Sequence, residues 1–123
     1  MRQHRALSKV RGNNEIKFVK ICGINLLIMK GVFSPYYFRS SEWFTKNISK
    51  IVGKKSFLEV GTGTGITSLK CAENGAGVVA GDINSIAVRN AKINALLNDI
   101  KIDIRKSDVF SNLKKSEKFD VIF

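Results

Sequence analysis

The stretch FLEVGTGTGITSL, residues 57–69, decides the fold of this chain. Its apolar start is typical of a short buried strand, and the residues after the glycines have a helical pattern. Three glycines, Gly61, Gly63 and Gly65, stand at alternate positions between the two, and Glu59 comes two residues before the first of them. The stretch therefore predicts a strand, a tight turn and a helix, with a carboxylate at the entrance of the turn.

The elements around this turn follow one another in the order of an α/β fold. Strands are predicted over 57–60, 78–80, 100–104 and 119–123, and helices over 66–73 and 85–98. The third strand alternates isoleucine with charged residues, so one of its faces is polar and it is expected at an edge of the sheet. Strands separated by single helices imply right-handed crossovers and a parallel, doubly wound sheet.

Upstream of residue 54 the pattern predicts a hairpin and one helix. Residues 16–22 alternate apolar and charged side chains, a turn is expected at 23–25, and residues 26–29 can return as a second strand. A helix capped by Ser40 or Ser41 is expected to run to Gly53.

Apolar residues spaced for one helical face indicate which side of each helix is buried. We expect Phe44, Ile48, Ile51 and Val52 on the buried face of the first helix, and Ile86, Ile93 and Leu97 among the inward residues of the helix at 85–98. The predicted organisation has three parts. A basic flexible tail covers 1–14, the lead-in hairpin and helix cover 15–53, and the α/β domain covers 54–123.

Composition limits the class of protein. A chain of 123 residues with 44% apolar and 25% charged residues is one globular domain or part of one. The net charge of +11 favours an acidic partner such as RNA or another nucleic acid, although solvated surface lysines explain it equally. Cys22 and Cys71 lack metal-ligand spacing and are expected to be free thiols.

No segment of the sequence is typical of a membrane span or a secretion signal. The longest purely apolar run, residues 26–29, is far too short to cross a bilayer, and no hydrophobic signal core follows the basic start. We therefore expect a cytoplasmic protein without a membrane partner.

The glycine turn is open to several interpretations. A P-loop is excluded because no lysine follows the last glycine, and in a dinucleotide turn the third glycine comes one residue later than Gly65. A tight turn without a ligand remains an alternative. Glu59 favours a cationic ligand, because a carboxylate repels a pyrophosphate. S-adenosylmethionine, which carries an ammonium and a sulfonium group, is such a ligand.

Further carboxylates follow the next two predicted strands. Ligands of doubly wound sheets lie over the carboxyl ends of the strands, where Asp82 and Asp108 are expected. Asp82 comes 21 residues after Gly61, a spacing that suits hydrogen bonds to ribose hydroxyls and serves an NAD ribose equally well. The alternatives are that Asp82 and Asp108 only cap turns and that Glu59 pairs with a surface lysine.

Four segments, FLEVGTGTGITSL, VVAGDINSIAVRNAKINA, KSDVF and KFDVIF, resemble in order the first four motifs of class I S-adenosylmethionine-dependent methyltransferases. The resemblance runs from about Phe57 to Phe123. It is closest to the small-domain subgroup that contains release-factor glutamine and ribosomal RNA guanine-N2 methyltransferases. The segment GVFSPYYFRSSEWFTKNI is similar to the lead-in of that subgroup. The resemblance implies the N-terminal half of a Rossmann-like sheet, with the hairpin and helix before it.

The resemblance also implies roles for particular residues. Glu59, Gly61, Gly63 and Gly65 would form the loop that holds S-adenosylmethionine. Asp82 would bind the ribose diol beside Ile83, which packs on the adenine. Asp108 would reach the adenine amino group, with Val109 against the ring, and Phe33 would help to close the pocket. The acceptor would be a nitrogen of RNA, DNA or a protein glutamine.

One family motif has no counterpart in the sequence. In the subgroup the strand that matches FDVIF leads into an Asn-Pro-Pro-Tyr-like loop that holds the acceptor nitrogen, whereas the only proline here is Pro35. No catalytic residue is predicted. We expect a truncated methyltransferase that is inactive alone and whose partner could be a missing C-terminal half. The alternatives are a non-catalytic module that binds S-adenosylmethionine or a partner, and an NAD-dependent oxidoreductase.

Overall fold

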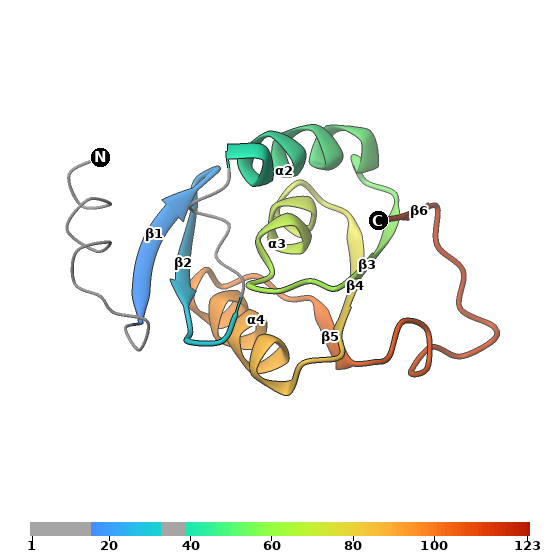
Figure 1. Cartoon of the computed structure of the whole chain (residues 1–123). Helices are drawn as coiled ribbons and strands as arrows, with labels where there is room; N and C mark the ends of the chain where they lie inside the picture. The colour runs from blue at the N-terminus through green and yellow to red at the C-terminus, as the bar shows by residue number, and fades with distance from the viewer. Residues whose placement is uncertain (1–15, 33–38) are drawn as a thin grey trace.

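The structure, a computed structural model, describes residues 16–32 and 39–123. A β-hairpin and a helix precede a four-stranded parallel sheet, so the predicted α/β class is confirmed (Figure 1). The elements are β1 Lys17–Ile21, β2 Ile24–Ile28, α2 Arg39–Val52, β3 Ser56–Val60, α3 Ile66–Glu73, β4 Gly77–Asp82, α4 Ser85–Leu97, β5 Asp103–Lys106 and β6 Val121–Ile122.

The hairpin turns over two residues, one position earlier than expected. Cys22 and Gly23 both have positive φ, 51° and 81°, and Ile21 lies opposite Ile24. Two-residue turns of this kind match the twist of antiparallel strands. The expectation of a turn at 23–25 is therefore wrong at Ile24 and Asn25, which belong to β2.

The parallel sheet has the strand order β5-β4-β3-β6. The third predicted strand lies at an edge, as expected, but it occupies Asp103–Lys106 instead of residues 100–104. Its start is delayed because the N–H of Ile100 bonds to the carbonyl of Ala95 and closes the end of α4. The fourth strand is also shorter than predicted and pairs through two residues, Val121 and Ile122.

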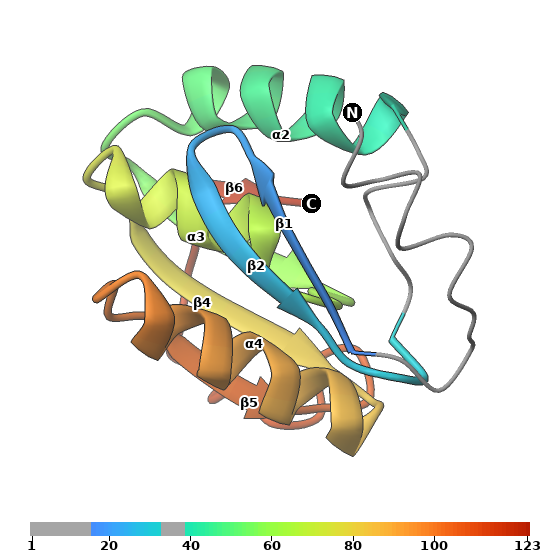
Figure 2. The same cartoon turned by 90° about the vertical axis from the view of Figure 1, so that its left-hand side faces the viewer.

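Helices α2, α3 and α4 lie on one side of this sheet, and the segment after β5 runs along the other side (Figure 1). The hairpin lies across α3 and α4 (Figure 2). One apolar cluster joins the hairpin, α3, α4, β4 and β5, and a smaller one joins α2, α3, β3 and β4. The hairpin therefore closes the core on the side away from the sheet.

The buried face of α2 differs from the expected apolar face. Phe44 and Ile51 are 44% and 61% exposed, whereas Thr45 and Ser49 are buried together with Val52. The Thr45 hydroxyl pairs with the Thr67 hydroxyl of α3 at 2.9 Å. Small hydroxyl side chains let the two helices approach closely, so they replace the bulky residues that the pattern favoured.

The inward face of α4 also differs from the prediction. Ile86 and Leu97 are largely exposed and Ile93 is half-buried. Alanines, asparagines and one valine take the buried positions against the sheet and the hairpin; they are Ala87, Ala91, Ala95, Asn90, Asn94 and Val88.

A row of asparagines, Asn90, Asn94 and Asn98, binds α4 to the outer edge of β2. The Oδ1 atoms accept the N–H groups of Met29, Leu27 and Asn25 at 2.7 to 2.9 Å. The side-chain amides return bonds to the carbonyls of Leu27 and Asn25. These side chains replace the neighbouring strand that the edge of β2 lacks.

Candidate functional site

A pocket of about 210 Å³ lies beside the glycine turn at the carboxyl end of β3. The turn forms one wall, and α2 and the end of the chain form others. Its lining residues are Ser41, Phe44, Glu59, Gly61, Thr62, Gly63, Thr64, Ile66, Thr67 and Phe123.

The three glycines of the turn serve different purposes. All have positive φ, +77° at Gly61, +58° at Gly63 and +89° at Gly65. A Cβ at either of the first two would meet no atom within 4 Å, so the backbone there is open to a ligand. A Cβ at Gly65 would lie 3.1 Å from the Cβ of Ala91, so this glycine lets α3 pack closely on α4.

Glu59 is buried beneath the turn, 6% exposed. The hydroxyls of Thr62 and Ser68 both donate to its Oε1, at 2.8 and 2.6 Å. Burial raises the pKa of Glu59 from 4.5 to about 7, although these hydrogen bonds lower it. The alternative that Glu59 pairs with a surface lysine is wrong, because its partners are the two hydroxyls.

Asp82 fixes the turn to the end of β4. Its Oδ2 accepts the N–H of Gly63 at 3.0 Å, and its Oδ1 accepts the N–H of Asn84 at 2.9 Å. The capping role considered for this residue is thus present. A carboxylate has about four acceptor positions, so these two bonds leave capacity for ligand hydroxyls.

The other predicted site residues lie on the same edge of the sheet, with one outside the described residues. The N–H of Ser107 bonds to the carbonyl of Asp82 at 2.9 Å, which brings the segment with Asp108 beside the end of β4. Asp108 is exposed, and Ile83 and Val109 are 63% and 52% exposed. Phe33 falls outside the described residues.

Val109 has an unusual backbone. Its φ of 58° is a left-handed conformation that a β-branched residue rarely adopts. The hydroxyl of Ser107 donates to its carbonyl at 3.0 Å and supports this geometry. Strained residues cluster at functional sites, which makes this segment a candidate part of the site.

An ion-pair network that sequence reasoning missed holds the same segment. The guanidinium of Arg105 donates to both carboxylate oxygens of Glu117 at 2.8 Å and to the carbonyl of Asn112 at 2.9 Å. It lowers the pKa of Glu117 to about 2. The sequence carries no signal for this pairing, because many cations could reach Glu117.

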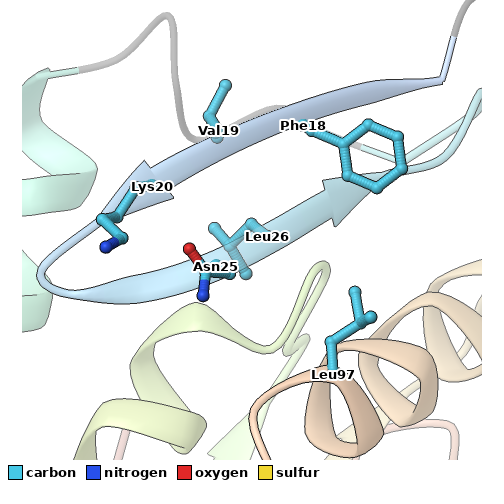
Figure 3. Close-up of a pocket in the computed structure, with 6 residues that line it drawn as sticks. All are labelled: Phe18, Val19, Lys20, Asn25, Leu26 and Leu97. Carbon is cyan, nitrogen blue, oxygen red and sulfur yellow. The ribbon is translucent and has the colours of Figure 1, made fainter.

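A larger hollow, of about 410 Å³, lies between the hairpin and the end of α4 (Figure 3). Phe18, Leu26 and Leu97 form its apolar wall, and Lys20 and Asn25 supply its polar groups. It contains neither a carboxylate nor a glycine turn. We therefore place the candidate site at the smaller pocket, where charged and backbone groups converge.

Two features were not found in the described parts of the chain, a cluster of metal-ligating side chains and a helix that could span a membrane. Across residues 16–32 and 39–123, no three His, Cys, Asp or Glu residues are grouped as metal ligands. Within the same ranges no helix is long and apolar enough to cross a membrane. Cys22 and Cys71 are free thiols, as predicted.

Residues 23–123 match the family model of the methyltransferase small domain. The chain belongs to this family of class I S-adenosylmethionine-dependent methyltransferases. A protein of Methanocaldococcus jannaschii, named "Putative protein N5-glutamine methyltransferase", is 42% identical over 105 residues. That match covers 85% of this chain and 51% of the relative, so the chain spans about half the relative's length.

Solved structures have the same fold. The 16S rRNA guanine-N2 methyltransferase RsmC of T. thermophilus, in complex with AdoMet and guanosine, superposes with a TM-score of 0.76 at 24% identity. The match covers 88% of this chain and 31% of RsmC. A ribosomal protein L11 methylase of Lactobacillus delbrueckii subsp. bulgaricus gives a TM-score of 0.64 at 29% identity, covering 74% of this chain and 47% of the other.

Proposed function

We propose that this chain holds S-adenosylmethionine at the carboxyl edge of the sheet, as the cofactor-binding part of a methyltransferase. The observation that carries the proposal is the buried carboxylate of Glu59 beside an open glycine turn. A buried carboxylate favours a cationic ligand, and open backbone at Gly61 and Gly63 lets that ligand approach closely. NAD carries a pyrophosphate and would be repelled at the same place.

The remaining predicted residues fit the rest of such a ligand. Asp82 would accept ribose hydroxyls while it holds Gly63. Ile83 and Val109 are exposed at the same edge and would flank the adenine, and Asp108 would accept its amino group. Phe33 is proposed to close the pocket on the strength of the family resemblance alone.

We further propose a nitrogen acceptor, in a protein glutamine or a nucleic-acid base. The bound cofactor would supply an electrophilic methyl group, and the chain would contribute by holding it in position. The name of the M. jannaschii relative supports a glutamine acceptor, and the net charge of +11 supports an acidic partner such as RNA. No described side chain is assigned to the acceptor, so we expect no transfer by these 123 residues alone.

Calorimetry with S-adenosylhomocysteine and NAD tests the cofactor proposal. We expect binding of the former and none of the latter. Asp82→Ala should weaken binding by at least about tenfold, because a hydrogen bond to a charged acceptor contributes about 1.5 to 3 kcal/mol. Tighter binding of NAD would overturn the proposal.

A matched control variant shows whether the effect of Asp82→Ala comes from a lost contact with the ligand or from a lost bond that supports the fold. Asp120 is another carboxylate that holds the backbone, since its Oδ2 accepts the N–H and the hydroxyl of Ser56 at the start of β3. Asp120→Ala should therefore leave the ligand affinity unchanged. An equal loss of affinity in both variants would mean that Asp82 acts only on the fold.

A further inference from the structure

The carboxylate of Glu59 has an unusual set of neighbours for a buried acid. Two hydroxyls donate to one oxygen, and the backbone N–H of Ser68 adds a further favourable interaction with the ionised form. Thr62 and Ser68 are themselves buried, 4% and 0% exposed. Solvent therefore does not orient these hydroxyls, and the carboxylate is their acceptor.

In the described parts of the chain, the groups that shift the pKa of Glu59 include no cation. Asp82 at the end of β4 is the charged group that acts on it, and it opposes ionisation. On α3 the neighbouring thiol of Cys71 has a pKa raised to about 12 by burial and by Glu59, so it stays neutral. The α2 residues that line the same pocket, Ser41 and Phe44, carry no charge.

We propose that Thr62 and Ser68 are positioning residues that hold Glu59 ready to ionise when a ligand brings an ammonium group into the pocket. This inference rests on the proposed function. Without a cation, burial raises the pKa of Glu59 to about 7, so the protonated and ionised forms are both populated near neutral pH. A cation in the pocket favours the carboxylate, so binding releases the proton to solvent. The hydroxyls of Thr62 and Ser68 then donate to the ionised carboxylate of Glu59 and fix its orientation.

The consequence is that ligand affinity should increase as the pH rises. If only the ionised form accepts the ammonium, affinity is full well above the midpoint of Glu59 and falls as the pH decreases through that midpoint. We expect S-adenosylhomocysteine to bind about tenfold more weakly at pH 6 than at pH 8. 5′-Methylthioadenosine keeps the nucleoside but lacks the amino-acid group, so its affinity should change less than about twofold.

Thr62 provides a matched pair of variants for the positioning role. Thr62→Val removes the hydroxyl and keeps the shape, whereas Thr62→Ser keeps the hydroxyl. Loss of the donor should move the pH midpoint of S-adenosylhomocysteine binding to higher pH, and Thr62→Ser should leave it in place. A residue that only supports the fold would change the stability of the chain without moving this midpoint.

The titration of Glu59 can also be followed without ligand. In the chain labelled with ¹³C at glutamate carboxyls, Glu59→Gln identifies the signal, which we expect to titrate near pH 7. Thr62→Val and Ser68→Ala should raise that midpoint. Unchanged midpoints in both variants would overturn the positioning role, even if no ligand bound.

The binding measurements with the two nucleosides distinguish this inference from the proposed function. Binding of S-adenosylhomocysteine with equal affinity at pH 6 and pH 8 would overturn this inference and leave the proposed function in place. Equal pH dependence for 5′-methylthioadenosine would show that the ammonium is not the coupled group. Failure of both nucleosides to bind at pH 8 would contradict the proposed function itself.

Discussion

The first and last crossovers both begin at the carboxyl edge of the sheet but are built differently. The first crossover, from β3 to β4 (residues 56–82), runs through the glycine turn, and its polar side chains Glu59, Thr62 and Ser68 are buried and hydrogen-bonded to one another. The last crossover, from β5 to β6 (residues 103–122), has no helix, and an ion pair holds it at the surface.

Because of this difference, the first crossover forms a rigid binding surface and the last crossover forms an adaptable one. The first crossover presents a buried acid held by hydrogen bonds and a fixed backbone, as a small charged group requires. The last crossover presents exposed side chains such as Val109 and Phe110, which can adjust to a flat ring. In the proposed site the amino-acid end of the ligand would meet the rigid crossover, and the adenine would meet the adaptable one.

The strongest test of the rigid crossover is Asn94→Ala. Asn94 is fully buried, and its amide bonds to the N–H and carbonyl of Leu27 and to the carbonyl of Thr64, so it joins the hairpin to the glycine turn. Its loss leaves several buried groups unsatisfied and should lower the free energy of unfolding by about 4 kcal/mol. Urea denaturation measures this.

Asn98→Ala is the control for that variant. Asn98 makes the same bonds to the N–H and carbonyl of Asn25, but in an exposed position where water can replace it. We expect a loss of about 1 kcal/mol. Similar losses for the two asparagines would contradict the view that burial decides how strongly these bonds hold the hairpin and the glycine turn in place.

The pH dependence of stability tests Glu59. Its pKa is about 7 in the fold against 4.5 in the unfolded chain, so its contribution is complete below pH 4.5 and is lost as the pH rises through 7. Relative to Glu59→Gln, the parent chain should lose about 3 kcal/mol between pH 4 and pH 8. Parallel stability curves for the two proteins would mean that Glu59 is not buried as described.

Gly65→Ala should cost about 2 kcal/mol, because the residue is left-handed and its new Cβ would lie 3.1 Å from that of Ala91. Gly63→Ala keeps the unfavourable φ but meets no atom within 4 Å, so it should cost about 1 kcal/mol. Thermal unfolding of both variants compares them. A larger effect at Gly63 would indicate packing that the structure lacks.

The smallest effect on stability is expected in the last crossover, from Arg105→Lys. Lysine cannot reproduce the two parallel bonds to Glu117, yet the pair lies near the surface, where water replaces much of the interaction. Amide hydrogen exchange should quicken over residues 107–118 and stay unchanged in β3 and α3. Faster exchange in both crossovers would show that they are not independent.

Much of the fold could be predicted from the order of strand and helix patterns around the glycine turn. The buried faces of α2 and α4 could not. Apolar periodicity favoured Ile51, Ile86 and Leu97, whereas close packing selected small and hydroxyl side chains in their place. Hydrogen bonds between residues far apart in the sequence, such as those of Asn94 to Leu27, also could not be predicted. The type of a residue does not indicate which distant residue it will contact.

The sequence predicts where the proposed site residues lie in the sheet, but it does not predict the contacts that hold them. The alternate glycines after the first strand, and the acids Asp82 and Asp108 expected after the next two, indicated one edge of the sheet, where they lie. The burial of Glu59 was not foreseen, because nothing in FLEVGTGTG tells whether the acid faces solvent. The roles of Thr62 and Ser68 depend on that burial and became visible only in the structure.

The most direct test of the central proposal is to map the ligand on the chain by ¹H–¹⁵N NMR during titration with S-adenosylhomocysteine. We predict that the largest shifts occur at the amides of Gly61, Gly63 and Gly65, with smaller ones at Asp82 and Asp108. The larger hollow between the hairpin and α4 is the competing location (Figure 3). Shifts centred on Phe18 and Leu97, with the glycine amides unmoved, would contradict the account.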